Sequence, residues 1–257
     1  EQYIYFIWTP PLQDLHSVPT RHAIVLAVSR SEPLAETARA LAKAGATGVH
    51  TAEADLSRAE SAEELIAETW EHSPIDVLIS SAGIYPATPF LELTPETWDT
   101  VLDLNTRAPL LLTVALARRV IAESRSANVV NITSGAAQRA RPGAAPYSTS
   151  KAALEMATRA SALELGAHGI RVNAVSPGFI TVDSEVNPVT EEYASAVGDN
   201  PLGRRGRPSD VARAVVWIAS DAAEWITGEV LRVDGGSSTG SWKLPQHWES
   251  SQSEETS

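Results

Sequence analysis

The feature that most constrains the fold is an alternation, repeated along the chain, of short apolar runs and segments with helical periodicity. Several of the apolar runs are rich in Val and Ile and too short for helices, which is typical of buried strands. Strands that alternate with helices predict a mostly parallel sheet covered on both faces. We therefore predict one α/β domain with a doubly wound parallel sheet in three layers, α/β/α. Strands are expected at 3–8, 23–28, 48–51, 75–79, 128–132, 170–175 and 229–233, and helices at 32–44, 61–71, 94–124, 147–167 and 209–220.

The 257 residues are enough for one large domain with a well-buried core. The net charge of -12 disfavours binding to nucleic acid or to an anionic membrane. The chain has no cysteine, which excludes disulfides, thiolate zinc sites and cysteine nucleophiles. None of the six histidines has a partner at metal-ligand spacing, so no metal site is expected. No apolar run approaches the roughly 18 residues that span a bilayer, and we expect a cytoplasmic protein.

A candidate chemical group is the pair of Tyr147 and Lys151, which lie four residues apart on one face of an expected helix. A nearby ammonium lowers the pKa of a phenol from about 10, so that it can exchange a proton near neutral pH. Such a pair alone is usually only a helix surface. Ser134, however, precedes Tyr147 by thirteen residues and follows a strand, at the edge where open α/β sheets bind ligands. Asn105 lies within the preceding helical segment.

Taken together, these residues resemble the short-chain dehydrogenase/reductase family. Tyr147, Lys151 and Ser134 match its catalytic motif at the usual spacing, and Asn105 matches its fourth catalytic residue. The resemblance covers about residues 23–238. Further matches are Asp55, Ser81-Ala82-Gly83 with Ser in place of Asn, the turn Ser176-Pro177-Gly178, and the C-terminal run from Trp225 to Gly236.

The resemblance implies a Rossmann-like fold and a role for each catalytic residue. Tyr147 would be the general acid/base, and Lys151 would lower its pKa and hold the nicotinamide ribose. Ser134 would orient the substrate carbonyl or hydroxyl, and Asn105 would position a water in a proton relay towards Lys151. The resemblance also implies cofactor contacts at Ser29, Arg30, Asp55, Leu56, Ser81, Ala82, Gly83, Lys151, Pro177, Gly178 and Ile180.

The chain departs from the family at the glycine-rich turn that normally follows the first strand and lets the backbone approach a pyrophosphate. Here Pro10, Asp14 and His16 stand where glycines are expected. Proline removes an N–H donor, and the aspartate would repel a pyrophosphate. The domain is therefore expected at 1–236, with an altered first βα unit at 1–22, followed by a mobile tail at 237–257.

The alternative choice of 23–28 as the first strand leaves only eight residues between Ala46 and Asp55, too few for a strand and a helix. Residues 23–28 are therefore assigned as the second strand. Ser29 and Arg30 then follow it, where the adenosine ribose lies in such folds. Because Arg30 has no acid beside it, the sequence favours NADP over NAD.

Three functions remain open. The first is an NADP-dependent oxidoreductase that interconverts a ketone and a secondary alcohol. The alternative is a non-redox lyase, isomerase or cyclase that has lost dinucleotide binding along with the glycine-rich loop. The third is a catalytically silent partner subunit. The substrate is a small molecule, and the resemblance favours a homo-oligomer, a tetramer over a dimer.

Two groups of arginines lie near the expected pocket. Arg139 and Arg141 fall between Ser134 and Tyr147, where they could face the pocket mouth. Arg204, Arg205 and Arg207 form a basic cluster near the expected lid and could meet an acidic substrate. For both groups, a solvated loop is the simpler interpretation.

Overall fold

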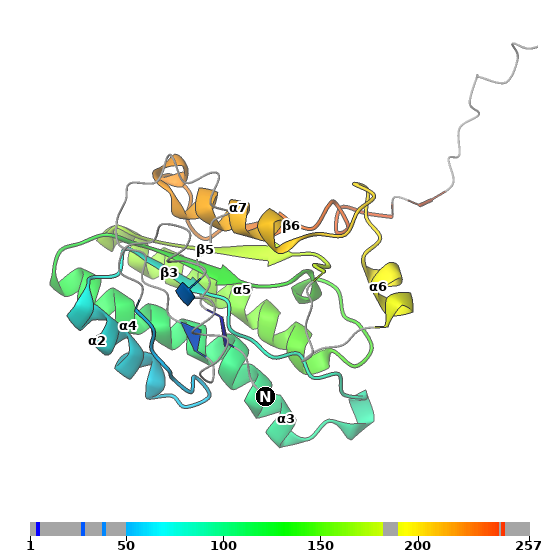
Figure 1. Cartoon of the computed structure of the whole chain (residues 1–257), viewed down its shortest axis with the longest axis horizontal. Coiled ribbons are helices and arrows are strands. Elements are labelled where there is room, and N and C mark those ends of the chain that lie inside the picture. The colour runs from blue at the N-terminus through cyan, green and yellow to red at the C-terminus, as the bar shows by residue number, and fades with distance from the viewer. Residues whose placement is uncertain are drawn as a thin grey trace, which may run out of the picture.

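A computed structural model describes residues 4–5, 27–28, 38–39, 50–181, 190–241 and 243–244. Within these residues the main sheet has four parallel strands in the order β3-β4-β5-β6, as predicted for the second half of the chain (Figure 1). Their bounds are Val77–Ser80 for β3, Ala127–Ile132 for β4, Ile170–Pro177 for β5 and Val230–Val233 for β6. The family-like α/β architecture is therefore confirmed in the described part of the chain.

Helices cover both faces of this sheet. On one face lie α2 (Ser61–His72), α4 (Ala108–Ala122) and α5 (Ala145–Leu165), and on the other lies α7 (Pro208–Ala219) (Figure 1). Neighbouring strands are in register, so Leu78, Val129 and Val172 align on one face, while Ile79 and Val130 align on the opposite face. The result is the three-layer α/β/α arrangement expected from the alternation of strands and helices.

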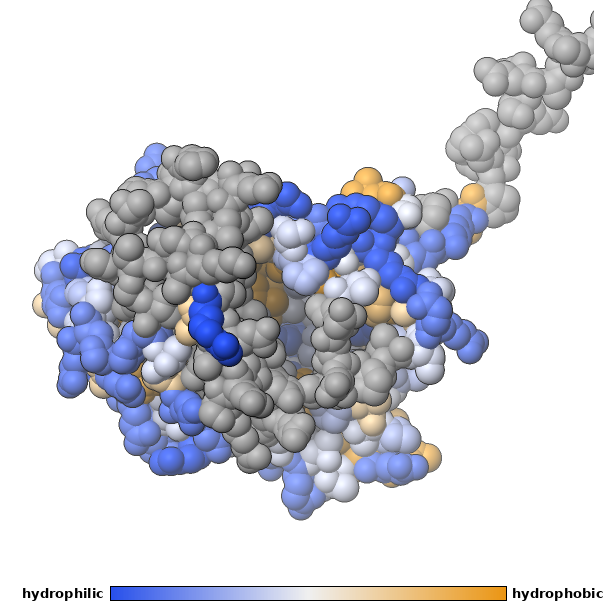
Figure 2. Space-filling model, viewed as in Figure 1, coloured by the Kyte–Doolittle hydropathy of each residue, from blue (hydrophilic) through white to orange (hydrophobic). Residues whose placement is uncertain are grey.

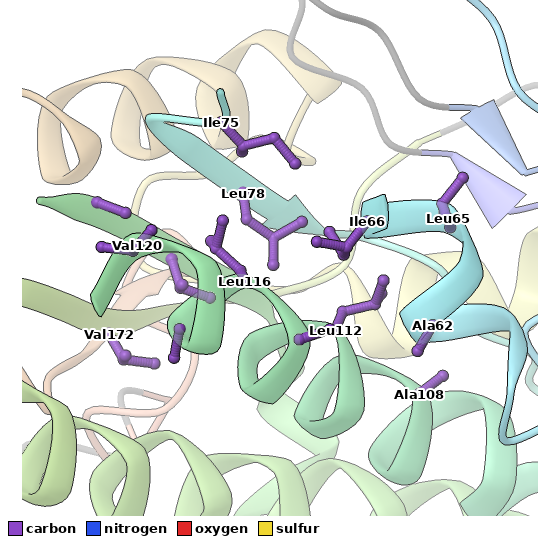
Figure 3. Close-up of a cluster of buried hydrophobic side chains, with 14 of the residues drawn as sticks. Ala62, Leu65, Ile66, Ile75, Leu78, Ala108, Leu112, Leu116, Val120 and Val172 are labelled. Carbon is purple, nitrogen blue, oxygen red and sulfur yellow. The ribbon is translucent and has the colours of Figure 1, made fainter. Parts of the chain in front are cut away.

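The larger core lies between the sheet and α2, α4 and α5. Leu112, Leu116 and Val120 recur on one side of α4 and meet Leu78 of β3 and Ile66 of α2 (Figure 3). This spacing puts apolar side chains on a single helical face. Burying each of them contributes roughly 1.5–3 kcal/mol, which fixes α4 and α5 against the sheet. On the face that Figure 2 shows, hydrophilic side chains predominate among the described residues.

The beginning of the chain differs from the prediction. Strands β1 (Ile4–Tyr5) and β2 (Ala27–Val28) pair antiparallel with each other in a separate two-stranded sheet. The expectation that both belong to the main parallel sheet was wrong. Three prolines between 10 and 19 disfavour the crossover helix that a parallel connection requires, so β2 returns antiparallel. Ser29, Arg30 and the altered turn at 9–21 lie outside the described residues, as does most of the expected helix at 32–44.

The expected helix at 94–124 consists of three consecutive parts. Helix α3 (Pro95–Leu102) begins after Thr94, whose hydroxyl accepts from the Thr97 N–H at 3.2 Å. A π-helical turn, η3 (Asp103–Arg107), leads directly into α4. A shorter helix that the sequence did not predict, α6 (Glu191–Val197), follows β5.

The sequence favours Ser209 as the cap of a helix that ends at 220, but the N-cap of α7 lies two residues earlier, at Arg207, and Pro208 occupies the first helical position. The Asp210 carboxylate accepts from the Arg207 N–H at 2.9 Å. Proline is pre-organised for the first helical position, which explains the shift. The short 3-10 helices are η2 (Phe90–Glu92), η4 (Gly135–Ala137), η5 (Gly166–His168) and η6 (Asp221–Ala223).

The C-terminal turn continues past residue 236, where the tail was expected to begin. The Asp234 carboxylate accepts from the N–H groups of Gly236 at 2.9 Å and Ser238 at 3.0 Å. Residues 245–257 lie outside the described part. None of the described helices combines the length and apolar character needed to cross a membrane.

Candidate active site

The carboxyl ends of three parallel strands meet at one edge of the sheet. The Thr133 N–H, just after β4, donates to the Val175 carbonyl of β5 at 2.8 Å. The Gly178 N–H, just after β5, donates to the Val233 carbonyl of β6 at 3.0 Å. Because β3 runs in the same direction, the segment from Ser81 to Gly83 leaves the sheet at this edge too. Ligands in open α/β sheets bind at such an edge.

Ser134 and Tyr147 come together at this edge. Ser134 has extended backbone and caps η4, because its hydroxyl accepts from the Ala136 N–H at 3.1 Å. Tyr147 lies in the first turn of α5 and is partly buried. The Ser134 side chain lies close enough to the Tyr147 phenol to lower its pKa. The structure therefore brings these two residues together at the sheet edge.

Lys151 lies one turn further along α5 and is buried. Its ammonium donates to the Ile132 carbonyl at 2.8 Å and lies 5.9 Å from the centroid of the Tyr147 ring. Burial lowers the pKa of Lys151 to about 8, because removal from water disfavours the charged amine.

The pKa of Tyr147 differs from the prediction. Burial raises the pKa of Tyr147 above its usual value of 10.0, and the Ser134 side chain and the positive charge of Arg141 lower it only in part. Lys151, which was expected to lower this pKa, is not among the groups that lower it. The Lys151 ammonium is directed at a main-chain carbonyl instead, and burial of the phenol dominates. Tyr147 is consequently a neutral phenol with a proton to donate at neutral pH.

Asn105 connects the β3 loop to α5. Its amide oxygen accepts from the Ile84 N–H at 2.8 Å, and its amide nitrogen donates to the Ile84 carbonyl at 2.9 Å and to the Ser150 hydroxyl at 3.0 Å. The Ser150 hydroxyl in turn donates to the Tyr147 carbonyl at 2.7 Å. Both N–H donors of the Asn105 amide are thus used within the protein, so its side chain acts on the site by positioning Ile84 and α5.

Two glycines bring backbone close to other groups at this edge. A Cβ at Gly83 would lie 3.0 Å from the Asn105 amide oxygen and 3.5 Å from the Lys151 nitrogen. A Cβ at Gly178 would lie 2.8 Å from two atoms of Asp234. Side chains at either position would push apart the segments that form the site.

Comparisons with known proteins agree with this geometry. A sequence model of a family described as Enoyl-(Acyl carrier protein) reductase matches residues 18–238. The chain belongs to the short-chain dehydrogenase/reductase family. It is 38% identical to the 3-oxoacyl-[acyl-carrier-protein] reductase of Synechocystis over 186 residues, which are 72% of this chain and 74% of the relative. It is 36% identical to the L-xylulose reductase of Mesocricetus auratus over 191 residues, 74% of this chain and 77% of that protein.

Solved structures of this family resemble the fold. A dehydrogenase/reductase from Sinorhizobium meliloti 1021 superposes with a TM-score of 0.77 and 32% identity, covering 84% of this chain and 85% of the other. A 4-hydroxyisoleucine dehydrogenase complexed with NADH gives a TM-score of 0.72 and 31% identity, covering 86% and 88%. The protein is accordingly an oxidoreductase of the short-chain dehydrogenase/reductase type.

The family resemblance assigns further positions to the cofactor, and these lie either around Asp55 or around Gly178. Asp55 accepts from the N–H and the hydroxyl of Ser57, at 3.0 and 2.6 Å, and thereby closes a turn. Arg107 of η3 donates to the Ser57 carbonyl, which ties this turn to the segment that carries Asn105. The Leu56 side chain belongs to the core, which leaves only its main chain for a ligand. Near Gly178, Ile180 forms an isolated parallel bridge with Gly206.

Two further tyrosines, Tyr85 and Tyr193, lie near Tyr147. The sequence did not single them out. The Tyr85 ring meets the Tyr147 ring edge-on, with centroids 4.8 Å apart and planes at 61°. The Tyr85 hydroxyl lies 3.2 Å from that of Tyr193 on α6, and Arg141 donates to the Tyr193 hydroxyl at 2.8 Å. Burial, and then the Tyr193 contact, raise the pKa of Tyr85 to about 12. No sequence signal joined these residues, because they come from three separate segments of the short-chain dehydrogenase/reductase fold.

Proposed function

We propose that this protein is an NADP-dependent oxidoreductase that interconverts a ketone and a secondary alcohol by hydride transfer. The observation that carries the proposal is the meeting of Ser134, the Tyr147 phenol and the buried Lys151, whose ammonium lies 5.9 Å from the centroid of the Tyr147 ring, at the ligand-binding edge of the sheet. Family membership supports the redox class.

The residues at the sheet edge fit the nicotinamide half of a dinucleotide. Gly83 and Gly178 keep backbone accessible where a Cβ would collide, and the Ser176 hydroxyl is buried without a partner in the described structure. Gly83, Lys151, Pro177, Gly178 and Ile180 would hold this half of the cofactor. When bound, the nicotinamide supplies or accepts the hydride.

Tyr147 and Ser134 supply the proton chemistry. A substrate carbonyl oxygen accepts hydrogen bonds from both hydroxyls, which polarises the carbonyl. As hydride reaches the carbonyl carbon, the neutral Tyr147 phenol gives its proton to the oxygen. Solvent protons then restore the phenol, and Lys151 would hold the nicotinamide ribose. Because burial raises the pKa of Tyr147, this arrangement favours ketone reduction near neutral pH.

Arg30 supports NADP as the preferred form, because an arginine after the second strand suits a 2′-phosphate. The pyrophosphate would be held without the usual glycine-rich turn, since Pro10, Asp14 and His16 replace its glycines. Asp55 and Ser29 would border the adenosine. Asn105 would keep its assigned place beside a proton relay to Lys151.

The test is direct binding and turnover. NADPH fluorescence should rise on mixing with the protein, and NADPH oxidation should accompany reduction of at least one member of a ketone panel. R30A should weaken NADPH binding about 10-fold or more while leaving NADH binding nearly unchanged. R118A is the matched control, because Arg118 is largely exposed on α4. A folded protein that binds neither nicotinamide would overturn the proposal and favour the non-redox alternative.

We also propose a homo-oligomer, a tetramer in preference to a dimer. Leu163 of α5 is 86% exposed and Trp225, before β6, is 97% exposed, which is unusual for large apolar side chains. Light scattering coupled to gel filtration measures the mass, and a monomer at micromolar concentration would contradict this assignment.

A further inference from the structure

Three residues form a rim over Tyr147, which we call the Tyr-Arg rim: Tyr85, Arg141 and Tyr193. Tyr85 follows β3, Arg141 lies between β4 and α5, and Tyr193 belongs to α6, which stands beyond the end of β5 (Figure 1). Arg141 donates to the Tyr193 hydroxyl at 2.8 Å, and its guanidinium carbon lies 5.8 Å from the centroid of the Tyr85 ring. Loops distant in sequence thus place one cation and two hydroxyls together.

Arg141 differs from Arg107, Arg204 and Arg205 in having no carboxylate partner among the described residues. Its Nε is buried and makes no hydrogen bond there, and its one hydrogen bond goes to a neutral hydroxyl. By contrast, Arg204 contacts both oxygens of Asp210 and Arg205 pairs with Glu191. A partly buried guanidinium with unused donors is unfavourable unless an anion meets it.

The basic cluster at Arg204 and Arg205 therefore does not serve as the anion site. Each of these two guanidinium groups is already matched by a carboxylate within the protein. Arg139 also lacks a carboxylate partner in the described part of the chain, but its guanidinium donates to the carbonyl and hydroxyl of Ser237, which leaves Arg141 as the candidate. It lies close enough to the reacting phenol for its charge to lower the pKa of Tyr147.

The geometry also limits how far the anion lies from the reacting carbonyl. The Tyr85 ring centroid lies 4.8 Å from that of Tyr147 and 5.8 Å from the guanidinium carbon of Arg141. Tyr85 thus contacts both the cation and the proton donor. We therefore expect a ligand that bridges them to be short.

We propose that Arg141, assisted by the hydroxyls of Tyr85 and Tyr193, binds a carboxylate of the substrate, so that the enzyme reduces a short oxo acid to a hydroxy acid. The inference rests on the proposed function and adds its substrate class. The planar guanidinium fork matches a carboxylate in two parallel hydrogen bonds. The carbonyl carbon gains hydride from the nicotinamide, its oxygen gains the Tyr147 proton, and the carboxylate is unchanged.

The first experiment compares acids with their uncharged esters. The substrates are 2-oxobutanoate, 3-oxobutanoate and 4-oxopentanoate, each beside its methyl ester, with NADPH. At least one acid should exceed its ester in kcat/KM by about 30-fold or more, and R141Q should remove this preference because the acid loses at least about 10-fold more activity than the ester. Equal use of acid and ester by the wild type, or equal losses for both in R141Q, would overturn the assignment.

R139Q is the matched control. Arg139 lies two residues away in the same loop but donates to the Ser237 carbonyl at 2.8 Å, away from the Tyr-Arg rim. Its replacement should leave the acid preference intact. Loss of that preference in R139Q as well as R141Q would show that loop integrity, and not the Arg141 charge, sets it.

The second experiment needs no turnover. Calorimetry measures butanoate, butanamide and inorganic phosphate binding to wild type, R141Q and Y147F. Butanoate should bind wild type and Y147F, and at least about 10-fold more weakly to R141Q. Tighter binding of phosphate or butanamide than of butanoate would overturn the carboxylate assignment. Selective butanoate binding without reduction of any ketone would retain the Arg141 site and remove the proposed redox function.

Discussion

The floor of the site, comprising Asn105, Tyr147, Ser150 and Lys151, is held largely by hydrogen bonds to main-chain groups. The Tyr-Arg rim is held by contacts between side chains that come from loops and a short helix. The floor therefore depends on the sheet and α5 staying in place. The rim can change residue by residue without disturbing the fold. In our proposal, chemistry and substrate choice are therefore carried by separate parts of the molecule.

The largest effect should come from removing the proton donor of the floor. Y147F should lower kcat by about 10³-fold, since general acid catalysis contributes up to about 10⁴-fold. Its melting temperature should change little, because the ring and its contact with Tyr85 remain. Single-turnover NADPH oxidation measures the rate, with Y85F as the control on the rim. A Y147F rate above one tenth of wild type would contradict the assignment of Tyr147.

Removing the side chain of Asn105, which connects the β3 loop to α5, should lower the stability of the protein as well as its rate. N105A leaves the N–H and C=O groups of Ile84 without their side-chain partners, and each unsatisfied buried group costs about 1–3 kcal/mol. We expect a loss of about 2–3 kcal/mol in the free energy of unfolding, measured by urea titration. T106A is the comparison, because Thr106 contributes one hydrogen bond to the Ser150 carbonyl at 2.9 Å. Equal losses in both variants would contradict the special role of Asn105.

Replacing Lys151 should make the protein more stable while abolishing its activity. Burial lowers its pKa from 10.5 to about 8, so at pH 7 the folded state carries a buried ammonium at unfavourable free energy. K151M should therefore abolish turnover yet raise the free energy of unfolding by about 1–2 kcal/mol at pH 7.

The pH dependence of that difference follows from proton binding. Between pH 8 and 10.5 the unfolded chain binds more protons at this lysine than the folded protein, so wild-type stability rises with pH. The difference in free energy of unfolding between K151M and the wild type should therefore shrink as the pH increases from 8 to 9.5. Urea titrations of both proteins at pH 7, 8 and 9.5 measure this difference. A lower stability of K151M at pH 7 would mean that the hydrogen bond to Ile132 outweighs the burial of charge.

The smallest effect should come from the rim. Y193F removes the hydroxyl that accepts from Arg141 but keeps the ring and leaves the guanidinium charge. We expect KM for the preferred substrate to rise by about 3- to 10-fold, the equivalent of one hydrogen bond, with kcat and melting temperature unchanged. If Y193F lowered kcat as much as Y147F does, the rim would take part in the chemical step, and the separation of the rim from the floor would be wrong.

The sequence was sufficient for the regular part of the fold. Strands such as β4 and helices such as α2 have local periodicity, and their positions differ from the predictions by only one or two residues. The placement of Ser134 beside Tyr147 followed from strand ends meeting at one edge. These features depend on local pattern and on the direction of parallel strands.

The sequence was insufficient where distant segments decide the outcome. The antiparallel pairing of β1 with β2 is not encoded in the apolar pattern of either strand. The raised pKa of Tyr147 depends on how deeply neighbouring segments bury it, which spacing alone does not reveal. The meeting of Tyr85, Arg141 and Tyr193 joins residues as far as 108 positions apart, without a motif.

The π-helical turn η3 makes the site sensitive to chain length as well as to residue type. A π-helical turn holds about one residue more than an α-helical turn, so deleting one residue from 103–107 would let this turn become α-helical. Leu112 and Leu116 of α4 could then stay in the core, but Asn105 inside the turn would shift away from Ile84. Libraries built by insertion and deletion should therefore spare 103–107, whereas substitutions at its exposed positions remain open to engineering.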